Sequence, residues 1–142
     1  MRASALDALG LLGAGYLRDR WVGEMSAGEK RRVMIARALV HQPEMLLLDE
    51  PSNALDLAAQ RELREILREV AAGPGGRRGT GVVMVTHHLA DILPEIDRVV
   101  MMRGGRIVAD GRKQELLQAA RLEELFSVEI ELTERHGYWH SW

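Results

Sequence analysis

The sequence predicts an α/β domain in which a parallel sheet is flanked by helices and followed by an antiparallel hairpin. Two short apolar runs, Met45–Leu48 and Val82–Val85, have the length and composition of strands buried on both faces. The segment between them, from about Leu57 to Ala72, has helical periodicity, and a strand–helix–strand order favours parallel pairing. Further along, Gly104-Gly105 stands between two more apolar runs, which is a strong signal for a β-hairpin.

Two helices are expected before the first strand. The first opens the chain, where apolar residues recur at helical spacing at Ala5, Ala8, Leu9 and Leu12. The second begins at Ser26, because Ser26 and Glu29 have the spacing of a capping box, and Pro43 ends it. Its inward face is expected to carry Val33, Ala36 and Val40. The basic residues near its start are expected on a solvated face: Lys30, Arg31 and Arg32.

The helix between the two strands should turn four apolar residues inward: Leu63, Ile66, Leu67 and Val70. On its outer face Arg61 and Glu65 lie one turn apart, at the spacing of an ion pair. The glycine-rich stretch Gly73–Gly81 that follows this helix is expected to form a flexible turn.

After the second strand, a short helix is expected from Leu89 until Pro94 interrupts it. The strands of the hairpin are expected at Val99–Met102 and Ile107–Ala109. A last helix is marked by apolar residues at Leu116, Leu117, Ala120 and Leu125. The end of the chain, His136–Trp142, has no ligand spacing and is expected to be a packed or frayed terminus.

Composition bounds the possible functions. At 142 residues the chain is one domain at most, with 46% hydrophobic and 28% charged residues, as in soluble proteins. The formal net charge of −2 provides no field that would attract nucleic acid, so no nucleic-acid partner is expected. The absence of cysteine excludes disulfides and thiol chemistry, and no apolar run approaches the roughly 20 residues of a membrane span. A cytoplasmic protein is expected.

Two carboxylates follow the first strand directly, at Asp49 and Glu50. In open parallel sheets ligands bind at the carboxyl ends of the strands. Asp49 there could hold Mg²⁺ through water, and Glu50 could orient or deprotonate a water molecule that attacks a phosphoryl group. From these residues alone, an ordinary strand-to-loop junction is an equally good interpretation.

Two further segments could bind phosphate. The helix that begins at Ser26 offers unpaired N–H groups and a positive dipole end to an anion, and Gly28 allows close approach of the backbone. An ordinary capping box is the alternative, and taken alone it is favoured. His87, just beyond the second strand, could contact a terminal phosphate or could be a simple loop histidine.

In this order, the segments resemble the carboxyl-terminal half of an ATP-binding cassette (ABC) ATPase. Met25–Glu29 is similar to the signature loop of that family, Met45–Glu50 to its Walker B strand, and Pro51–Asp56 to its D-loop. His87 matches its switch histidine, and the resemblance spans roughly residues 5 to 125. It implies a partial P-loop NTPase fold, with about residues 1–42 as the end of the helical subdomain and about residues 43–142 as part of the catalytic core.

The resemblance also implies roles for individual residues. Glu50 and His87 would be catalytic, Asp49 would hold Mg²⁺ through water, and ATP would be the nucleotide. In the family two cassettes pair head to tail, so the signature residues would bind ATP held by the other subunit: Ser26, Ala27, Gly28 and Glu29. The D-loop residues would lie at that dimer interface: Ser52, Asn53, Ala54, Leu55 and Asp56.

The sequence departs from the family in two ways. Met25, Ala27 and Glu29 stand where Leu, Gly and Gln are common, while Ser26 and Gly28 are kept. More seriously, no Gly-Lys pair occurs, so the G-x-x-x-x-G-K-[ST] loop that cradles the phosphates is missing, as is the glutamine loop. We therefore expect a fragment that cannot hold ATP tightly by itself.

The resemblance leaves three functions open. The first is the ATPase subunit of a membrane transporter, at the cytoplasmic face of the membrane with transmembrane permease subunits as partners. The second is a non-transport ABC ATPase of DNA repair, chromosome organisation or translation. The third is a non-catalytic module that supplies its signature loop to a partner cassette. The end of the chain resembles import-type subunits, which favours the first.

Overall fold

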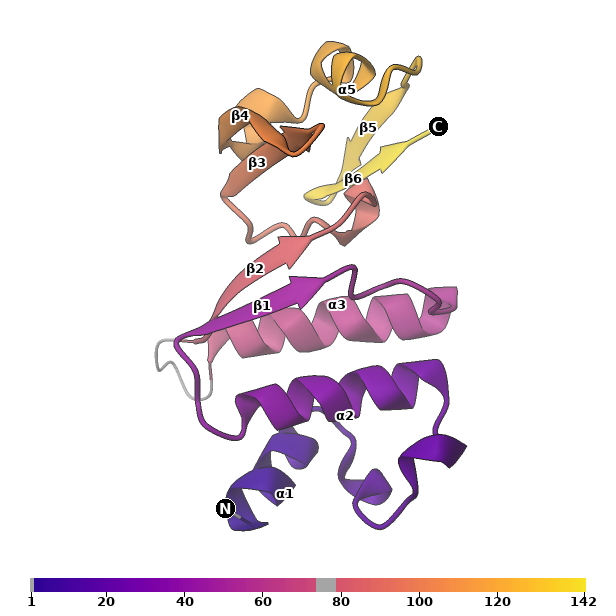
Figure 1. Ribbon diagram of the computed structural model, residues 1–142, viewed down its shortest axis with the longest axis vertical. Helices are drawn as coiled ribbons and strands as arrows, with labels where there is room; N and C mark the ends of the chain where they lie inside the picture. The colour runs from indigo at the N-terminus through magenta and orange to yellow at the C-terminus, as the bar shows by residue number, and fades with distance from the viewer. Residues whose placement is uncertain (1, 74–78) are drawn as a thin grey trace. The chain divides into compact units, whose positions relative to one another are not determined.

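The computed structural model describes residues 2–73 and 79–142, which form two compact units, Met1–His87 and His88–Trp142. The first unit contains, in chain order, α1 (Arg2–Leu11), single 3-10 turns at Gly15–Leu17 and Val22–Glu24, α2 (Ala27–Leu39), β1 (Met45–Asp49), α3 (Leu57–Ala72) and β2 (Gly81–Val85). Figure 1 shows α2 and α3 running side by side, with the two strands next to α3. The predicted turn at Gly73–Gly81 falls mostly on residues 74–78, which lie outside the described residues.

The strands β1 and β2 pair in parallel, from Met45 opposite Gly81 to Asp49 opposite Val85. The ladder extends past both ends of β1, because Gly81 N–H donates to the Glu44 carbonyl at 2.8 Å and Glu50 N–H donates to the Val85 carbonyl at 2.9 Å. Helix α3 supplies the crossover that parallel strands require. The predicted strand–helix–strand unit is thereby confirmed.

Helix α3 has the predicted bounds and buries the predicted residues: Leu63, Ile66, Leu67 and Val70. Its outer face carries the expected pair, with Arg61 Nε 3.1 Å from Glu65 Oε1. In α2 the buried residues are Ile35, Ala36 and Leu39, so of the predicted face only Ala36 is buried. The inward face of α2 is decided by its packing against α1 and α3, because its many apolar residues allow more than one face.

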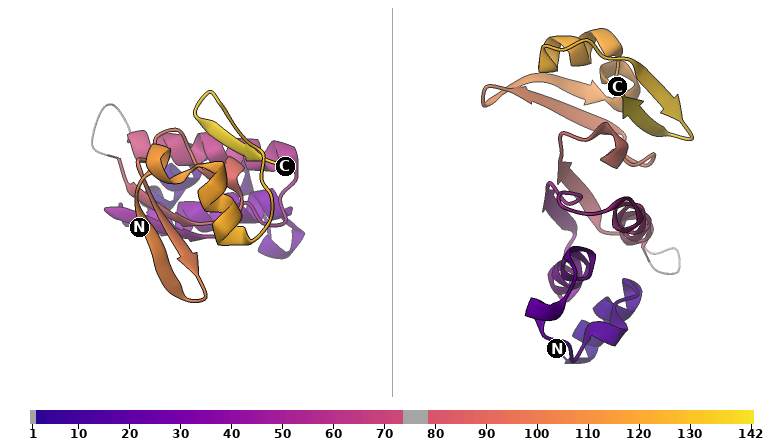
Figure 2. Two further views of the ribbon diagram at one scale, coloured as in Figure 1. Left: turned by 90° about the horizontal axis from the view of Figure 1, so that it is seen from above. Right: turned by 90° about the vertical axis from the view of Figure 1, so that its right-hand side faces the viewer.

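The prediction that both strands are buried on two faces is wrong. In β1 only Leu46 and Leu48 are buried, whereas Met45 and Leu47 are 63% and 70% exposed. In β2 the exposed positions include Val83 and Val85. In Figures 1 and 2 α3 lies along one face of the pair, and that face alone is covered by helix within the first unit. The apolar run therefore alternates between buried and exposed residues.

The second unit is built on two hairpins. Its elements are a 3-10 turn at Leu89–Asp91, β3 (Arg98–Arg103), β4 (Arg106–Arg112), α4 (Lys113–Leu116), α5 (Ala119–Phe126), β5 (Leu132–Arg135) and β6 (Tyr138–Ser141). The predicted hairpin is confirmed as the antiparallel pair β3–β4. Gly104 and Gly105 have φ angles of 57° and 74°, the left-handed values that a two-residue type I′ turn requires.

One expectation for this unit is wrong. The predicted single last helix is divided into α4 and α5, because Leu117 and Gln118 leave the helical conformation. With this break, Leu116, Leu117 and Leu122 are all buried together with Met101. The expectation of a packed terminus is confirmed, because Trp139 packs against the buried cluster that contains Met101 and Leu122. The terminus forms the hairpin β5–β6, whose turn residues His136 and Gly137 have positive φ angles of 55° and 81°.

None of the helices within residues 2–73 and 79–142 combines the length and the apolar character that a membrane span requires.

Truncation of the α3 core should destabilise the first unit. Leu67 is 1% exposed, so Leu67→Ala is expected to lower the free energy of unfolding by about 2–5 kcal/mol through lost burial and the cavity left behind. Leu57→Ala, at a position of the same helix that is 83% exposed, is the control and should change it by less than about 0.5 kcal/mol. Urea unfolding followed by circular dichroism measures both, and equal effects would contradict the observed packing.

Candidate functional site

The carboxyl ends of β1 and β2 bring two of the predicted catalytic side chains together. Glu50 follows the last residue of β1, and His87 lies two residues beyond the last residue of β2. Since the strands are parallel and in register, both residues leave the sheet at the same edge. There His87 Nδ1 lies 2.7 Å from Glu50 Oε1. Asp49 occupies the last position of β1, at the same edge.

This contact is short enough for a hydrogen bond between the imidazole and the carboxylate. A carboxylate without a proton only accepts hydrogen bonds, so such a bond needs the imidazole proton on His87 Nδ1. The other carboxylate oxygen, Glu50 Oε2, is buried and has no hydrogen-bond partner in the described part of the chain. A buried oxygen left in this way is the kind of atom that a bound water, cation or substrate group would satisfy.

The backbone of Glu50 is held in an unusual conformation. Its φ angle is 42°, in the left-handed region that costs an L-residue other than glycine about 1 kcal/mol or more. Its N–H donates to Val85, and its carbonyl accepts from Asn53 N–H at 3.2 Å and from the Arg31 guanidinium at 3.4 Å. Such strain persists where the surroundings over-determine it, and here these hydrogen bonds hold the Glu50 backbone.

The predicted capping box at the start of α2 is confirmed. Glu29 N–H donates to Ser26 Oγ at 3.2 Å, and Ser26 N–H donates to Glu29 Oε2 at 2.8 Å. Lys30 N–H donates to the Ser26 carbonyl at 2.9 Å. The N–H groups of Ala27 and Gly28 take no part in the capping box, and N–H groups in the first turn of a helix can bind an anion. Packing also favours glycine at position 28, because a Cβ atom there would lie 3.2 Å from Ala59 Cβ on α3.

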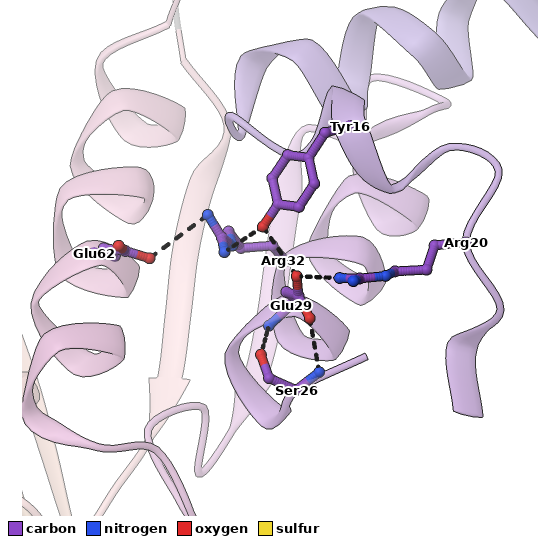
Figure 3. Close-up of polar contacts among 6 residues, drawn as sticks. All are labelled: Tyr16, Arg20, Ser26, Glu29, Arg32 and Glu62. Carbon is purple, nitrogen blue, oxygen red and sulfur yellow. Dashed lines mark hydrogen bonds and ion pairs between the residues drawn. The ribbon is translucent and has the colours of Figure 1, made fainter. Parts of the chain in front are cut away.

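The Glu29 carboxylate is the centre of a polar network, drawn in Figure 3. Its Oε1 accepts from Arg20 at 2.9 Å and from the Tyr16 hydroxyl at 3.2 Å. Tyr16 in turn accepts from Arg32 at 3.1 Å, and Arg32 lies 3.5 Å from Glu62 on α3. The Ser26 N–H that donates to Glu29, with smaller contributions from Tyr16 and Arg20, holds the pKa of Glu29 below its usual range, so Glu29 is ionised at neutral pH.

The D-loop-like residues connect β1 to α3. Asp56 is the N-cap of α3, and its Oδ1 accepts from Ala59 N–H at 2.8 Å. Ser52 is buried, whereas Asn53 and Ala54 are exposed, and Ala54 has a φ angle of 61°. The Leu55 carbonyl accepts from the Gln60 side chain at 3.1 Å. The exposed residues Asn53 and Ala54 are therefore followed by two residues, Leu55 and Asp56, that are hydrogen-bonded to α3.

Several residues of the site escaped the sequence analysis. Tyr16, Arg20 and Glu62 lie far from Glu29 in the chain, and no spacing rule connects them to it. The expectation that Arg31 and Arg32 are solvated is wrong, because Arg32 is 20% exposed and bonded to Tyr16, while Arg31 reaches the Glu50 carbonyl. Long arginine side chains span gaps between helices whose packing a sequence does not reveal.

Curated relatives match nearly the whole chain. It is 36% identical over 138 residues to the sulfate/thiosulfate import ATP-binding protein CysA of Bordetella pertussis, covering 97% of the chain and 38% of that protein. It is 42% identical over 120 residues to the molybdenum import ATP-binding protein ModC of Mycobacterium tuberculosis, covering 84% of the chain and 31% of that protein. The chain therefore spans well under half the length of these two relatives.

Solved structures share the fold. An ABC transporter in an inward-facing conformation superposes with a TM-score of 0.83 at 24% identity, covering 98% of the chain and 54% of the solved one, and this shows the fold alone. The ADP conformation of an ATP-binding cassette of an ABC transporter superposes with a TM-score of 0.75 at 29% identity, covering 89% of the chain and 50% of that cassette. The predicted P-loop NTPase fold of ABC type is confirmed.

The family model described as ABC transporter matches residues 1–53, which include the capped start of α2 and the acidic end of β1. Family model, relatives and solved structures thus agree on the segments from which the site is built. The chain belongs to the ABC transporter family and is similar to part of that family's ATP-binding cassette.

Proposed function

We propose that this chain is part of an ATPase subunit that couples ATP hydrolysis to import across a membrane. The observation that carries the proposal is the pairing of Glu50 with His87 at the edge of the parallel sheet. It supports a site in which a carboxylate next to an imidazole handles water and phosphate. The relatives named as import ATP-binding proteins support transport over the DNA-repair, chromosome and translation alternatives.

Glu50 is proposed to orient the attacking water and accept its proton, and His87 to contact the terminal phosphate of ATP. The contact with His87 Nδ1 occupies one Glu50 oxygen, and the other, Oε2, which has no hydrogen-bond partner among the described residues, is proposed to meet the water. A general base contributes typically 10²–10⁴-fold in rate.

The residues at the edge of the sheet fit magnesium. Carboxylate oxygens are the ligands that this hard ion prefers, and the buried Glu50 Oε2 provides an unsatisfied oxygen close to Asp49 in the chain. Asp49 would hold the ion through water. When bound, the ion would neutralise phosphate charge.

The start of α2 is proposed to serve a second nucleotide. In a head-to-tail dimer of two cassettes, Ser26–Glu29 would bind ATP held by the partner, and Ser52–Asp56 would lie at the interface. The exposed Asn53 and Ala54 and the first-turn N–H groups support this arrangement. The phosphate-cradling loop is absent from these 142 residues, so it is proposed to come from another segment. Permease subunits would hold the assembly at the cytoplasmic face of the membrane.

Removing the proposed base should separate hydrolysis from binding. In the complete ATPase that contains this sequence, Glu50→Gln is expected to slow hydrolysis by roughly 10²–10⁴-fold while leaving the Kd for ATP within a few-fold. Glu44→Gln, an exposed glutamate at the other end of β1, is the matched control and should leave both unchanged. Steady-state turnover and nucleotide binding measure the two, and near-normal turnover in Glu50→Gln would refute the assigned role.

The contact between His87 and Glu50 should make their effects non-additive. His87→Ala is expected to reduce turnover on its own but to reduce it much less when Glu50 is already replaced by Gln, because the two side chains meet at 2.7 Å and act on one step. A double-mutant cycle on kcat measures this coupling. Fully additive losses in the double variant would show that the two residues act independently.

The isolated 142-residue chain should bind ATP weakly. It lacks the backbone cradle and lysine that hold the β- and γ-phosphates, so Mg-ATP is expected to bind with a Kd well above the micromolar range. Isothermal titration of the chain with Mg-ATP measures this. Micromolar affinity would contradict the proposal that the phosphate loop comes from another segment.

A further inference from the structure

The Glu29 network raises a question about charge. An ionised carboxylate lies in the first turn of α2, where the proposed function places the phosphates of ATP, and a negative charge there would repel them. The structure shows how this carboxylate is occupied. Oε2 is turned back onto Ser26 N–H at 2.8 Å, and Oε1 is bound by the Arg20 guanidinium at 2.9 Å, as Figure 3 shows.

We propose that Arg20 is a positioning residue for nucleotide binding, which holds the Glu29 carboxylate against the helix cap and neutralises it. The inference rests on the proposed function and extends it to a residue outside the signature-like segment. Arg20 belongs to the loop before α2, so its ion pair with Glu29 joins the loop to the helix start, as do the hydrogen bonds that Tyr16 makes with Glu29 and Arg32.

Geometry favours Arg20 over the other cation of the network. Arg32 reaches Glu29 only through the Tyr16 hydroxyl and is itself directed at Glu62 on α3. Arg20 contacts the carboxylate directly, and the Glu29 side chain is only 14% exposed, so water screens the pair less than it would a fully exposed one. Loss of Arg20 would leave the Glu29 charge bound by neutral donors alone.

Three substitutions test the role in the assembled ATPase. Arg20→Gln removes the charge and shortens the side chain, and it is expected to raise the KM for ATP roughly 3–10-fold with a smaller effect on kcat. Arg20→Lys keeps the charge and should stay within about two-fold of the wild type. Arg18→Gln is the matched control, because Arg18 pairs with the neighbouring Asp19 at 2.7 Å and does not serve Glu29.

Two readouts separate an electrostatic role from a structural one. In a Glu29→Gln background, Arg20→Gln should change KM by less than about two-fold, because no charge is left to neutralise. The ratio of KM between Arg20→Gln and the wild type should also shrink as salt rises from about 0.1 M to 1 M, since screening shortens from about 10 to 3 Å. Circular dichroism establishes that each variant is folded.

The outcomes distinguish this inference from the proposed function. If the wild type hydrolyses ATP but Arg20→Gln has the KM of the wild type, or raises KM equally in the Glu29→Gln background and at every salt concentration, the role of Arg20 is overturned and the proposed function stands. If the wild-type assembly shows no Mg-ATP hydrolysis, both are overturned. A KM increase that Glu29→Gln and high salt both remove supports the positioning role.

Discussion

The parallel pairing of β1 and β2 is the constraint on which the proposed catalytic edge depends. Asp49 pairs with Val85, so Glu50 and His87 leave the sheet at the same level and meet at 2.7 Å. A slip of one residue would turn Leu46 and Leu48 to the exposed face and would separate the two side chains. The register is held from the opposite end as well, where Thr80 Oγ1 donates to the Pro43 carbonyl at 3.0 Å.

The start of α2 is organised around a different interaction, the capping box and the ion pair that extends it. The cap satisfies two backbone N–H groups at the start of the helix. The same helix contributes Arg31, whose guanidinium contacts the Glu50 carbonyl. One helix therefore carries the proposed anion-binding end and also contacts the backbone of the proposed base, both within the first unit.

The edge of the sheet and the start of α2 differ in electrostatic character. The edge of the sheet carries Asp49 and Glu50, which suit a cation and a water molecule, while the first turn of α2 suits an anion once Glu29 is neutralised. Under the proposed function they serve different nucleotides. The chain would then contribute two different half-sites, each completed by residues from elsewhere.

The sequence by itself determined which elements form and where most chemistry lies. Local patterns predict strand β1, helix α3 with its four buried residues, the Gly104-Gly105 hairpin and the Ser26–Glu29 cap, because spacing and turn chemistry act over a few residues. The family came from the resemblance of the motifs. Tertiary structure alone decided the one-sided burial of β1 and β2, the break at Leu117 and the terminal hairpin at His136-Gly137. It also decided that Arg20 and Tyr16 meet Glu29, since contacts between residues distant in the chain depend on how the elements pack rather than on any local pattern.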